Sequence, residues 1–275
     1  MQPCANVIKI YAYAHKTYGN MHGDFILLLE HGGTNLQEFA KVLLKSDQII
    51  DIFIQIFKGL DYIHNFGEDK LIHRDIKPAN IFVRVDGNKL EVKIGDMGQI
   101  RNTGLKSTKT YRGAQGTVPF MAIEVLQKYI EIQGTTRAFD ASIYNQSADV
   151  YAGGLSLLYT IMTIVAFHDY TSLTQISKKI PCLPEYFPIK FHNLVSTMIH
   201  PESSKRPTAS EVRTALEKFK TNPEDMKKFE EAFRRLKAYN KYMEEFENGD
   251  IMNYDYIMIE QAIRIYKKKK PSSDG

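Results

Sequence analysis

This sequence of 275 residues contains very little cysteine: Cys4 and Cys182 are its only two. They lie far apart and show no metal-ligand spacing, which excludes a disulfide framework and a zinc module. So little cysteine fits a reducing, intracellular compartment, and we therefore expect a cytoplasmic protein.

Apolar runs long enough to cross a membrane are missing as well. The best candidate, residues 153–167, has about 15 residues, whereas a spanning helix needs roughly 20. We predict instead a helix buried in a protein core. The first residues, Met-Gln-Pro-Cys-Ala-Asn, do not have the basic segment and apolar core of a signal peptide.

Charge of one sign is not in large excess either, because the net charge is only +4. It is spread widely except for the lysines at 267–270, so it gives no clear argument for nucleic acid. Those lysines could touch acidic membranes or nucleic acid, but a solvated tail is the simpler interpretation. With 43% hydrophobic residues, the chain can bury one large core or two modest ones.

The first half of the chain combines strand and helix patterns. Two short apolar runs, residues 7–13 and 25–30, predict a β-hairpin with a long loop. Helical spacing follows in two apolar stripes, which predict two packed helices. The first stripe is Leu36, Phe39, Ala40 and Leu43, and the second is Ile49, Phe53, Ile56, Leu60 and Ile63.

A second hairpin is predicted from residues 81–85 and 90–94, with Asp86-Gly87-Asn88 as its turn. Residues 99–115 show no periodicity and predict a surface loop. Residues 209–219 are amphipathic, and Thr221-Asn222-Pro223 predicts the start of a long charged helix that runs to about Glu247.

Residues 71–83 carry the most informative motif, Leu-Ile-His-Arg-Asp-Ile-Lys-Pro-Ala-Asn-Ile-Phe-Val. Asp75 can accept a hydroxyl proton, Lys77 can neutralise a phosphate oxygen, and Asn80 can offer its carbonyl oxygen to Mg²⁺. That combination suits phosphoryl transfer to an alcohol. Such triplets also occur in polar turns, but a solvated turn has no need of the apolar residues on both flanks.

This motif resembles the catalytic loop of protein kinases. The position of Lys77 resembles serine/threonine kinases, and Thr117 fits the same class. The resemblance implies transfer of the γ-phosphate of ATP, with Mg²⁺, to Ser or Thr of a protein substrate. It also implies an α+β fold: a mainly helical kinase large lobe, a remnant β-hairpin of the small lobe, and a C-terminal helical extension.

Two further segments resemble the nucleotide site of the family. Asp96-Met97-Gly98 resembles the kinase Asp-Phe-Gly element, which implies that Asp96 joins Asn80 as a metal ligand. Residues 27–33 resemble the hinge, whose backbone groups bind adenine. The residues implied there are Leu29 as gatekeeper, Glu30 and Gly32 in the hinge, and Phe82 as the apolar floor under the base.

Other matches imply structural or regulatory roles. Glu124 ends a segment similar to the family's Ala-Pro-Glu element, with Ile123 replacing proline, and is expected to pair with Arg206. Asp149 is expected to anchor the backbone of the catalytic loop. Arg74 matches the residue that pairs with a phosphate group on the activation loop in this family. Candidate carriers are Thr108, Thr110 and Tyr111, although these could also be plain solvated hydroxyls.

The Gly-rich loop and the strand lysine of the kinase small lobe are not found in the sequence. We therefore expect residues 1–35 to be a remnant of the small lobe and hinge, 36–219 the large lobe, and 220–275 a helical extension with a basic tail. The chain is then either part of a longer kinase or a catalytically inactive binding or scaffold module. By itself we expect it to bind Mg-ATP weakly and to transfer little or no phosphate.

The predicted C-terminal helix carries an apolar stripe that could dock on a partner chain or on the large lobe itself. Its members are Phe229, Phe233, Leu236, Tyr239, Met243 and Phe246.

Overall fold

The computed structural model describes residues 4–18, 21–41, 44–67, 70–87, 89–102, 116–132, 143–162 and 183–247. The chain divides into two compact units, Met1–Arg234 and Arg235–Gly275. Every contact described below lies within the first unit.

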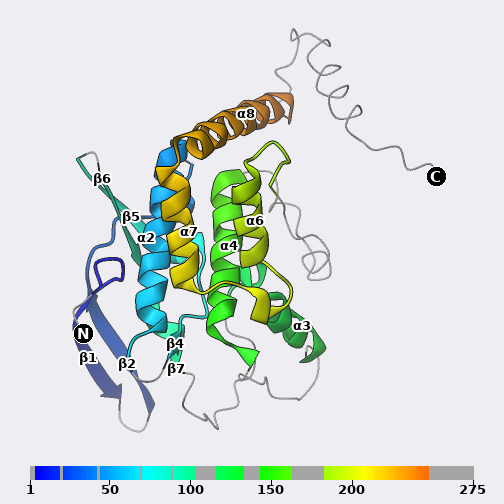
Figure 1. Ribbon diagram of the computed structural model, residues 1–275. Helices are drawn as coiled ribbons and strands as arrows, with labels where there is room; N and C mark the ends of the chain where they lie inside the picture. Colours follow the sequence, from blue (N-terminus) through cyan, green and yellow to red (C-terminus); the bar gives the residue numbers. More distant parts are fainter. Residues whose placement is uncertain are drawn as a thin grey trace. The chain divides into compact units, whose positions relative to one another are not determined.

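The elements form a mainly helical structure with small antiparallel sheets, so the predicted α+β class is confirmed (Figure 1). The helices are α1 (Leu36–Phe39), α2 (Ser46–His64), α3 (Ile123–Ile132), α4 (Gln146–Met162), α6 (Ile189–Met198), α7 (Ala209–Thr221) and α8 (Pro223–Glu247). The strands are β1 (Ile10–Tyr18), β2 (Met21–Leu29), β3 (Thr34–Asn35), β4 (Leu71–Ile72), β5 (Ile81–Asp86), β6 (Lys89–Ile94) and β7 (Arg101–Asn102).

The first hairpin is longer than predicted. β1 and β2 pair antiparallel through His15 opposite Phe25 and Lys16 opposite Asp24, so the predicted long loop is wrong. The rings of His15 and Phe25 stack with their centres 4.3 Å apart. The described side chains of both strands are exposed to water, so the pairing does not require an alternation of apolar and polar residues. The sequence pattern therefore does not show how far the strands extend.

The first helix is shorter than its stripe suggested. α1 begins after Asn35, whose side chain accepts a hydrogen bond from the Glu38 N–H, and it ends at Phe39. Only Leu36 of its residues is buried. Ala40 follows as the C-cap, and Leu43 lies outside the described residues.

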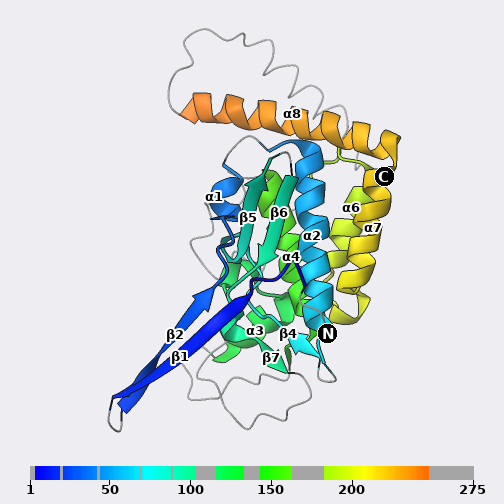
Figure 2. The same ribbon diagram turned by 90° about the vertical axis from the view of Figure 1, so that its left-hand side faces the viewer.

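The second helix forms the centre of the core, as its stripe predicts. α2 packs against α7 on one side and β6 on another (Figures 1 and 2). Full burial of one large apolar side chain contributes roughly 1.5–3 kcal/mol, so this stripe is a major source of stability. Its buried members are Ile49, Phe53, Ile56, Leu60 and Ile63.

α4 is the buried helix predicted from residues 153–167, of which the structure describes those up to Met162. Two glycines let it pack closely. A Cβ atom on Gly153 would lie 2.7 Å from Cζ of Phe57 in α2, and one on Gly154 would lie 2.7 Å from Cγ2 of Ile199, which follows α6. Larger residues at these positions would push α4 away from its neighbours. Among the described residues, no helix has the length and apolar character needed to cross a membrane.

α8 begins at Pro223, as predicted, after Asn222 accepts a hydrogen bond from the Asp225 N–H. Its first turns pack on α6 and α7, because the ring of Phe229 contacts Phe191 and Phe219 at centre distances of 4.7 and 5.8 Å. This confirms intramolecular docking for the start of the helix. The side chains of Met243 and Phe246, and the lysines at 267–270, lie outside the described part.

Candidate active site

The predicted catalytic loop lies between α2 and the β5–β6 hairpin. It leaves β4 at Ile72, passes through a 3₁₀ turn at Pro78–Asn80 and enters β5 at Ile81. Proline at the start of that turn fits, because its missing N–H is not needed there. The loop is therefore held at both ends by regular structure, as the sequence predicts.

The structure brings Asp75, Lys77 and Asn80 together. Asp75 is only 5% exposed. Its Oδ2 accepts a hydrogen bond of 2.9 Å from Asn80 Nδ2 and lies 2.9 Å from Lys77 Nζ. Oδ1 accepts a hydrogen bond of 2.8 Å from the hydroxyl of Thr117, which in turn accepts one of 2.6 Å from Lys77 Nζ. A buried carboxylate is thus fixed in orientation by three side chains.

The backbone of this loop is anchored by Asp149 on α4, which confirms the expected contact. The two carboxylate oxygens accept hydrogen bonds of 2.8 Å from the backbone N–H groups of His73 and Arg74. Arg74 has a φ of 71°, in the left-handed region that costs energy for a residue with a side chain. The two hydrogen bonds to Asp149 hold the backbone in this conformation.

Two histidines that sequence reasoning missed complete the anchor. His64, at the end of α2, lies 2.9 Å from Asp149 Oδ2 through Nε2, and His73 Nε2 lies 2.9 Å from the Gly95 carbonyl oxygen. Burial opposes ionisation of Asp149, but the hydrogen bond and charge of His64, with further help from His73, outweigh it and lower the pKa of that carboxyl. His73 lies within the motif at 71–83, and its place in that motif is the sequence feature that could have identified it.

Asp96 is positioned directly beyond β6. The Gly95 N–H donates a hydrogen bond of 2.9 Å to the Asn80 carbonyl oxygen, which ties this turn to the catalytic loop. Asp96 itself is exposed, and its backbone lies in the left-handed region, with a φ of 55°. Its side chain caps the following 3₁₀ turn by accepting from the Gly98 N–H at 3.4 Å.

The amide oxygen of Asn80 and the carboxylate of Asp96 are oxygen donors of the kind that fits Mg²⁺. Both hydrogen bonds described for the Asn80 side chain use its nitrogen, so the amide oxygen remains for a cation. The described residues contain no group of three or more His, Cys, Asp or Glu side chains that could hold a metal. Mg²⁺ commonly binds through one or two protein ligands plus phosphate oxygens and water.

Of the residues expected to bind adenine, the structure brings Phe82 and Gly32 together. A Cβ atom on Gly32 would lie 2.7 Å from Cβ of Phe82, and one on Gly95 would lie 2.6 Å from its Cε2. The Phe82 side chain therefore lies against both glycines, between the expected hinge and the turn to Asp96. Leu29 is 45% exposed at the end of β2, directly before Glu30.

Glu124 and Arg206 form the expected ion pair. Arg206 donates hydrogen bonds of 2.8 and 2.7 Å to the two carboxylate oxygens and a further one of 2.7 Å to the His200 carbonyl oxygen. Its guanidinium also lies 4.6 Å from the centre of the Tyr151 ring. This pair joins the start of α3 to the loop before α7.

The regulatory part of the site is described only at Arg74. Its Nε donates a hydrogen bond of 2.6 Å to the Gln99 carbonyl oxygen, and its guanidinium lies 5.6 Å from the centre of the Tyr144 ring. The proposed phosphate carriers Thr108, Thr110 and Tyr111 lie outside the described residues. Their role stays a prediction.

The sequence model of the protein kinase domain matches residues 1–216. The chain belongs to the protein kinase family. Similar proteins include the serine/threonine-protein kinase pkpA of Phycomyces blakesleeanus, 34% identical over 71% of this chain and 30% of the relative. The human serine/threonine-protein kinase Nek5 is 27% identical over 70% of this chain and 26% of the relative. A probable serine/threonine-protein kinase of Dictyostelium discoideum is 28% identical over 66% of this chain and 12% of the relative. The chain thus spans less than a third of the length of these curated relatives.

Proposed function

We propose that this site transfers the γ-phosphate of ATP to Ser or Thr side chains of protein substrates. The observation that carries the proposal is the Asp75 carboxylate, buried and oriented by Lys77, Asn80 and Thr117 at 2.8 to 2.9 Å. A base held in this way needs no reorganisation when a substrate hydroxyl arrives. The similarity to serine/threonine-protein kinases supports the same substrate class.

In this proposal Asp75 accepts the proton of the substrate hydroxyl. Lys77 lies 2.9 Å from the same carboxylate, so its charge is placed where a phosphate oxygen would approach. Asn80 has two tasks: its nitrogen orients Asp75, and its oxygen would bind the cation.

Asn80 and Asp96 would hold Mg²⁺, and the bound ion would supply positive charge against the phosphate oxygens. The exposed carboxylate of Asp96 suits an ion that retains water and phosphate ligands. Residues 30 to 32 would offer backbone groups to the adenine ring, with Phe82 as the floor and Leu29 as the gatekeeper. We further propose a cytoplasmic location, where ATP and protein substrates are available, and the domain division at residues 35 and 219.

A second function, binding of partners without phosphoryl transfer, is favoured by the β1–β2 hairpin. Its apolar residues are unusually exposed, with Tyr13 at 77% and Phe25 at 71%. Exposed apolar surface of this kind is typical of an interaction surface.

One experiment separates the two functions. The purified chain is incubated with Mg-ATP and a mixture of Ser/Thr-containing protein substrates, beside the Asp75→Asn variant, and phosphate incorporation is measured. Transfer by the wild type that falls at least about 100-fold in the variant supports the kinase function. Absence of transfer by the wild type, at the level of the Asp75→Asn variant, contradicts the kinase function and favours binding of partners without phosphoryl transfer.

A further inference from the structure

Lys93 is a buried cation in the middle of the site. It belongs to β6, the strand that leads to Asp96, and is only 7% exposed. Lysine is almost never buried unless its charge is paired, because removing an ammonium group from water is costly. The partners of Lys93 therefore indicate what this residue does.

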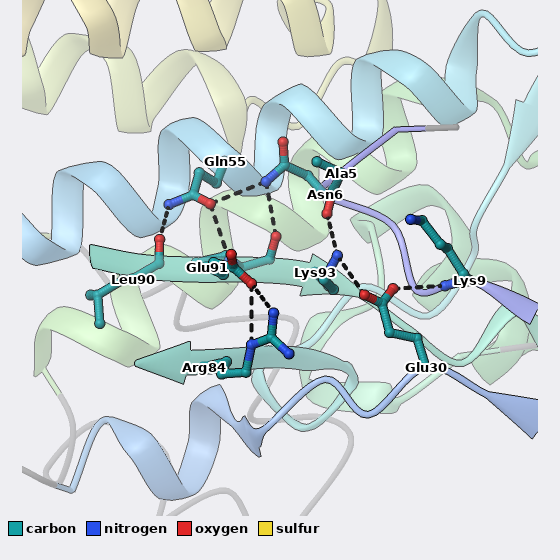
Figure 3. A network of polar contacts seen from close by, with 10 residues as sticks. Ala5, Asn6, Lys9, Glu30, Gln55, Arg84, Leu90, Glu91 and Lys93 are labelled. Atoms are coloured by element: carbon teal, nitrogen blue, oxygen red, sulfur yellow. Dashed lines mark hydrogen bonds and ion pairs between the residues drawn. The ribbon is translucent and has the colours of Figure 1, made fainter. Parts of the chain in front are cut away.

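The ammonium group bridges two segments that are distant in sequence (Figure 3). Nζ donates a hydrogen bond of 2.7 Å to the Ala5 carbonyl oxygen and lies 3.1 Å from Oε1 of Glu30. The other oxygen of Glu30 accepts a hydrogen bond of 3.2 Å from the Lys9 N–H. The Glu30 N–H in turn donates one of 2.9 Å to the Lys9 carbonyl oxygen. Glu30 is thus held through both its backbone and its side chain.

One side of this bridge is rigid. The Asn6 side chain donates hydrogen bonds to Gln55 on α2, at 3.1 Å, and to the Val92 carbonyl oxygen, at 2.9 Å. The Val92 N–H donates to the same Gln55 oxygen at 3.0 Å. Because the segment around Asn6 is fixed to α2 and β6, the Ala5 carbonyl gives Lys93 a fixed anchor (Figure 3).

The other side is weakly supported. The hairpin that leads to Glu30 exposes its apolar side chains, for example Leu28 at 61% and Leu29 at 45%, so few packing contacts hold Glu30 from that side. Packing against Phe82 begins only at Gly32. Burial opposes ionisation of Glu30, but the hydrogen bond from Lys93 and the Lys9 N–H outweigh it and lower the pKa of the carboxyl. Glu30 therefore carries its negative charge at neutral pH.

We propose that Lys93 is a positioning residue for nucleotide binding, which fixes the hinge segment 30–33 relative to the strand that carries Asp96. This inference rests on the proposed function. Through Glu30, Lys93 fixes the position of the backbone groups that would bind adenine. Through β6, it fixes the position of the metal ligand Asp96. Loss of the bridge would loosen the adenine end while leaving Asp75 and its partners in place.

The test compares the full chain with Lys93→Met, which keeps most of the volume and removes the charge, and with Glu30→Gln. Lys190→Met is the control, since it removes a lysine that pairs with a carboxylate, Asp225, on helices α6 and α8 and not in the hinge segment. Hydrogen exchange of the Glu30 amide is measured without ligand. Binding of adenosine and of the magnesium complex of a non-hydrolysable ATP analogue is measured by calorimetry.

The expected result is a rise of about tenfold in exchange at the Glu30 amide in Lys93→Met, with amides of α2 unchanged. Adenosine affinity should fall by about tenfold in Lys93→Met and Glu30→Gln, and not in Lys190→Met. Asp96→Asn should weaken the magnesium complex only. A purely structural role would raise exchange equally across the core and would overturn the inference.

The remaining outcomes are also decisive. A wild type that binds adenosine, with a Lys93→Met variant that binds it equally well, overturns the inference and leaves the proposed function intact. A wild type that binds neither ligand contradicts the proposed function and removes the role of Lys93 in nucleotide binding with it. In that case the exchange data still report whether Lys93 fixes the hinge segment.

Discussion

Arg206 and Glu124, separated by 82 positions in the sequence, meet through two hydrogen bonds of 2.8 and 2.7 Å. The Arg206 side chain has no exposed surface, whereas that of Glu124 is 26% exposed. The guanidinium is therefore the more deeply buried charge. Removing Glu124 leaves that charge without its carboxylate partner.

We expect Glu124→Gln and Arg206→Leu each to lower the free energy of unfolding by roughly 3–5 kcal/mol. Glu124→Gln leaves the buried guanidinium uncompensated, and Arg206→Leu removes its hydrogen bonds to Glu124 and to the His200 carbonyl oxygen. Urea unfolding measures the change. Lys205→Ala serves as the control, since Lys205 and Glu202 form an exposed pair and its loss should cost about 1 kcal/mol or less. Equal effects of the buried and exposed pairs would contradict this interpretation.

Tyr151, whose ring lies beneath the Arg206 guanidinium, should make the free energy of unfolding depend on pH in the alkaline range. Burial raises the pKa of its phenol to about 12, with Arg206 opposing and Glu124 adding to the effect. In the unfolded chain the phenol titrates near about 10. As pH rises from about 10 to about 12, the unfolded chain loses the proton while the native state retains it, so stability falls by roughly 2–3 kcal/mol.

Tyr151→Phe keeps the ring under Arg206 and removes the ionisable group. We expect its free energy of unfolding, measured in urea between pH 8 and 12, to fall less steeply above pH 10 than that of the wild type. Parallel curves for the two proteins would show that Tyr151 does not carry this dependence.

Local patterns made part of the fold predictable. The stripe on α2 recurs at helical spacing, and such spacing reports burial directly, so the helix and its core residues were both found. The motif at 71–83 places Asp75, Lys77 and Asn80 within one short loop, and their proximity follows from chain connectivity alone. Apolar flanks further fixed where that loop enters β5.

Contacts between distant segments were harder to predict. The pairs of His64 with Asp149 and of Lys93 with Glu30 join residues far apart in sequence, and no periodic pattern marks either. Only the resemblance to the family indicated that Asp149 anchors the loop. The extent of the first hairpin was missed for a different reason: its strands are open to water, so their composition carries no burial signal.

Thr117 should act on the rate of transfer through its two hydrogen bonds. Its hydroxyl donates to Asp75 and accepts from Lys77, at 2.8 and 2.6 Å. Thr117→Val removes both bonds at nearly constant volume, so Asp75 should lose its orientation. We expect kcat to fall by roughly 10- to 100-fold, equivalent to about 1.4–2.8 kcal/mol of transition-state stabilisation, with KM for ATP little changed.

Because the chain by itself is expected to transfer little phosphate, initial rates with Mg-ATP and a protein substrate are measured at high enzyme concentration. Thr117→Ser retains the hydroxyl and is the matched control, with a kcat expected within a few-fold of the wild type. A Thr117→Val enzyme as fast as Thr117→Ser would show that Asp75 does not need this contact.

The exposed hairpin should contribute little to the stability of the large lobe. Tyr13 and Phe25 are 77% and 71% exposed, whereas Phe53 in α2 is fully buried. Substituting either hairpin residue by Ser removes few packing contacts, so the free energy of unfolding should change by only about 0.5 kcal/mol. Phe53→Ala, the buried counterpart, should cost roughly 3–5 kcal/mol.

The same two hairpin variants should change self-association. Long strands with exposed apolar side chains favour edge-to-edge pairing between copies, and a polar side chain weakens that pairing. Light scattering at increasing protein concentration should therefore show less association for Tyr13→Ser and Phe25→Ser than for the wild type. If both variants associate as the wild type does while their stability is unchanged, the hairpin is not the surface responsible. A large loss of stability in either would mean that its side chain is buried in solution.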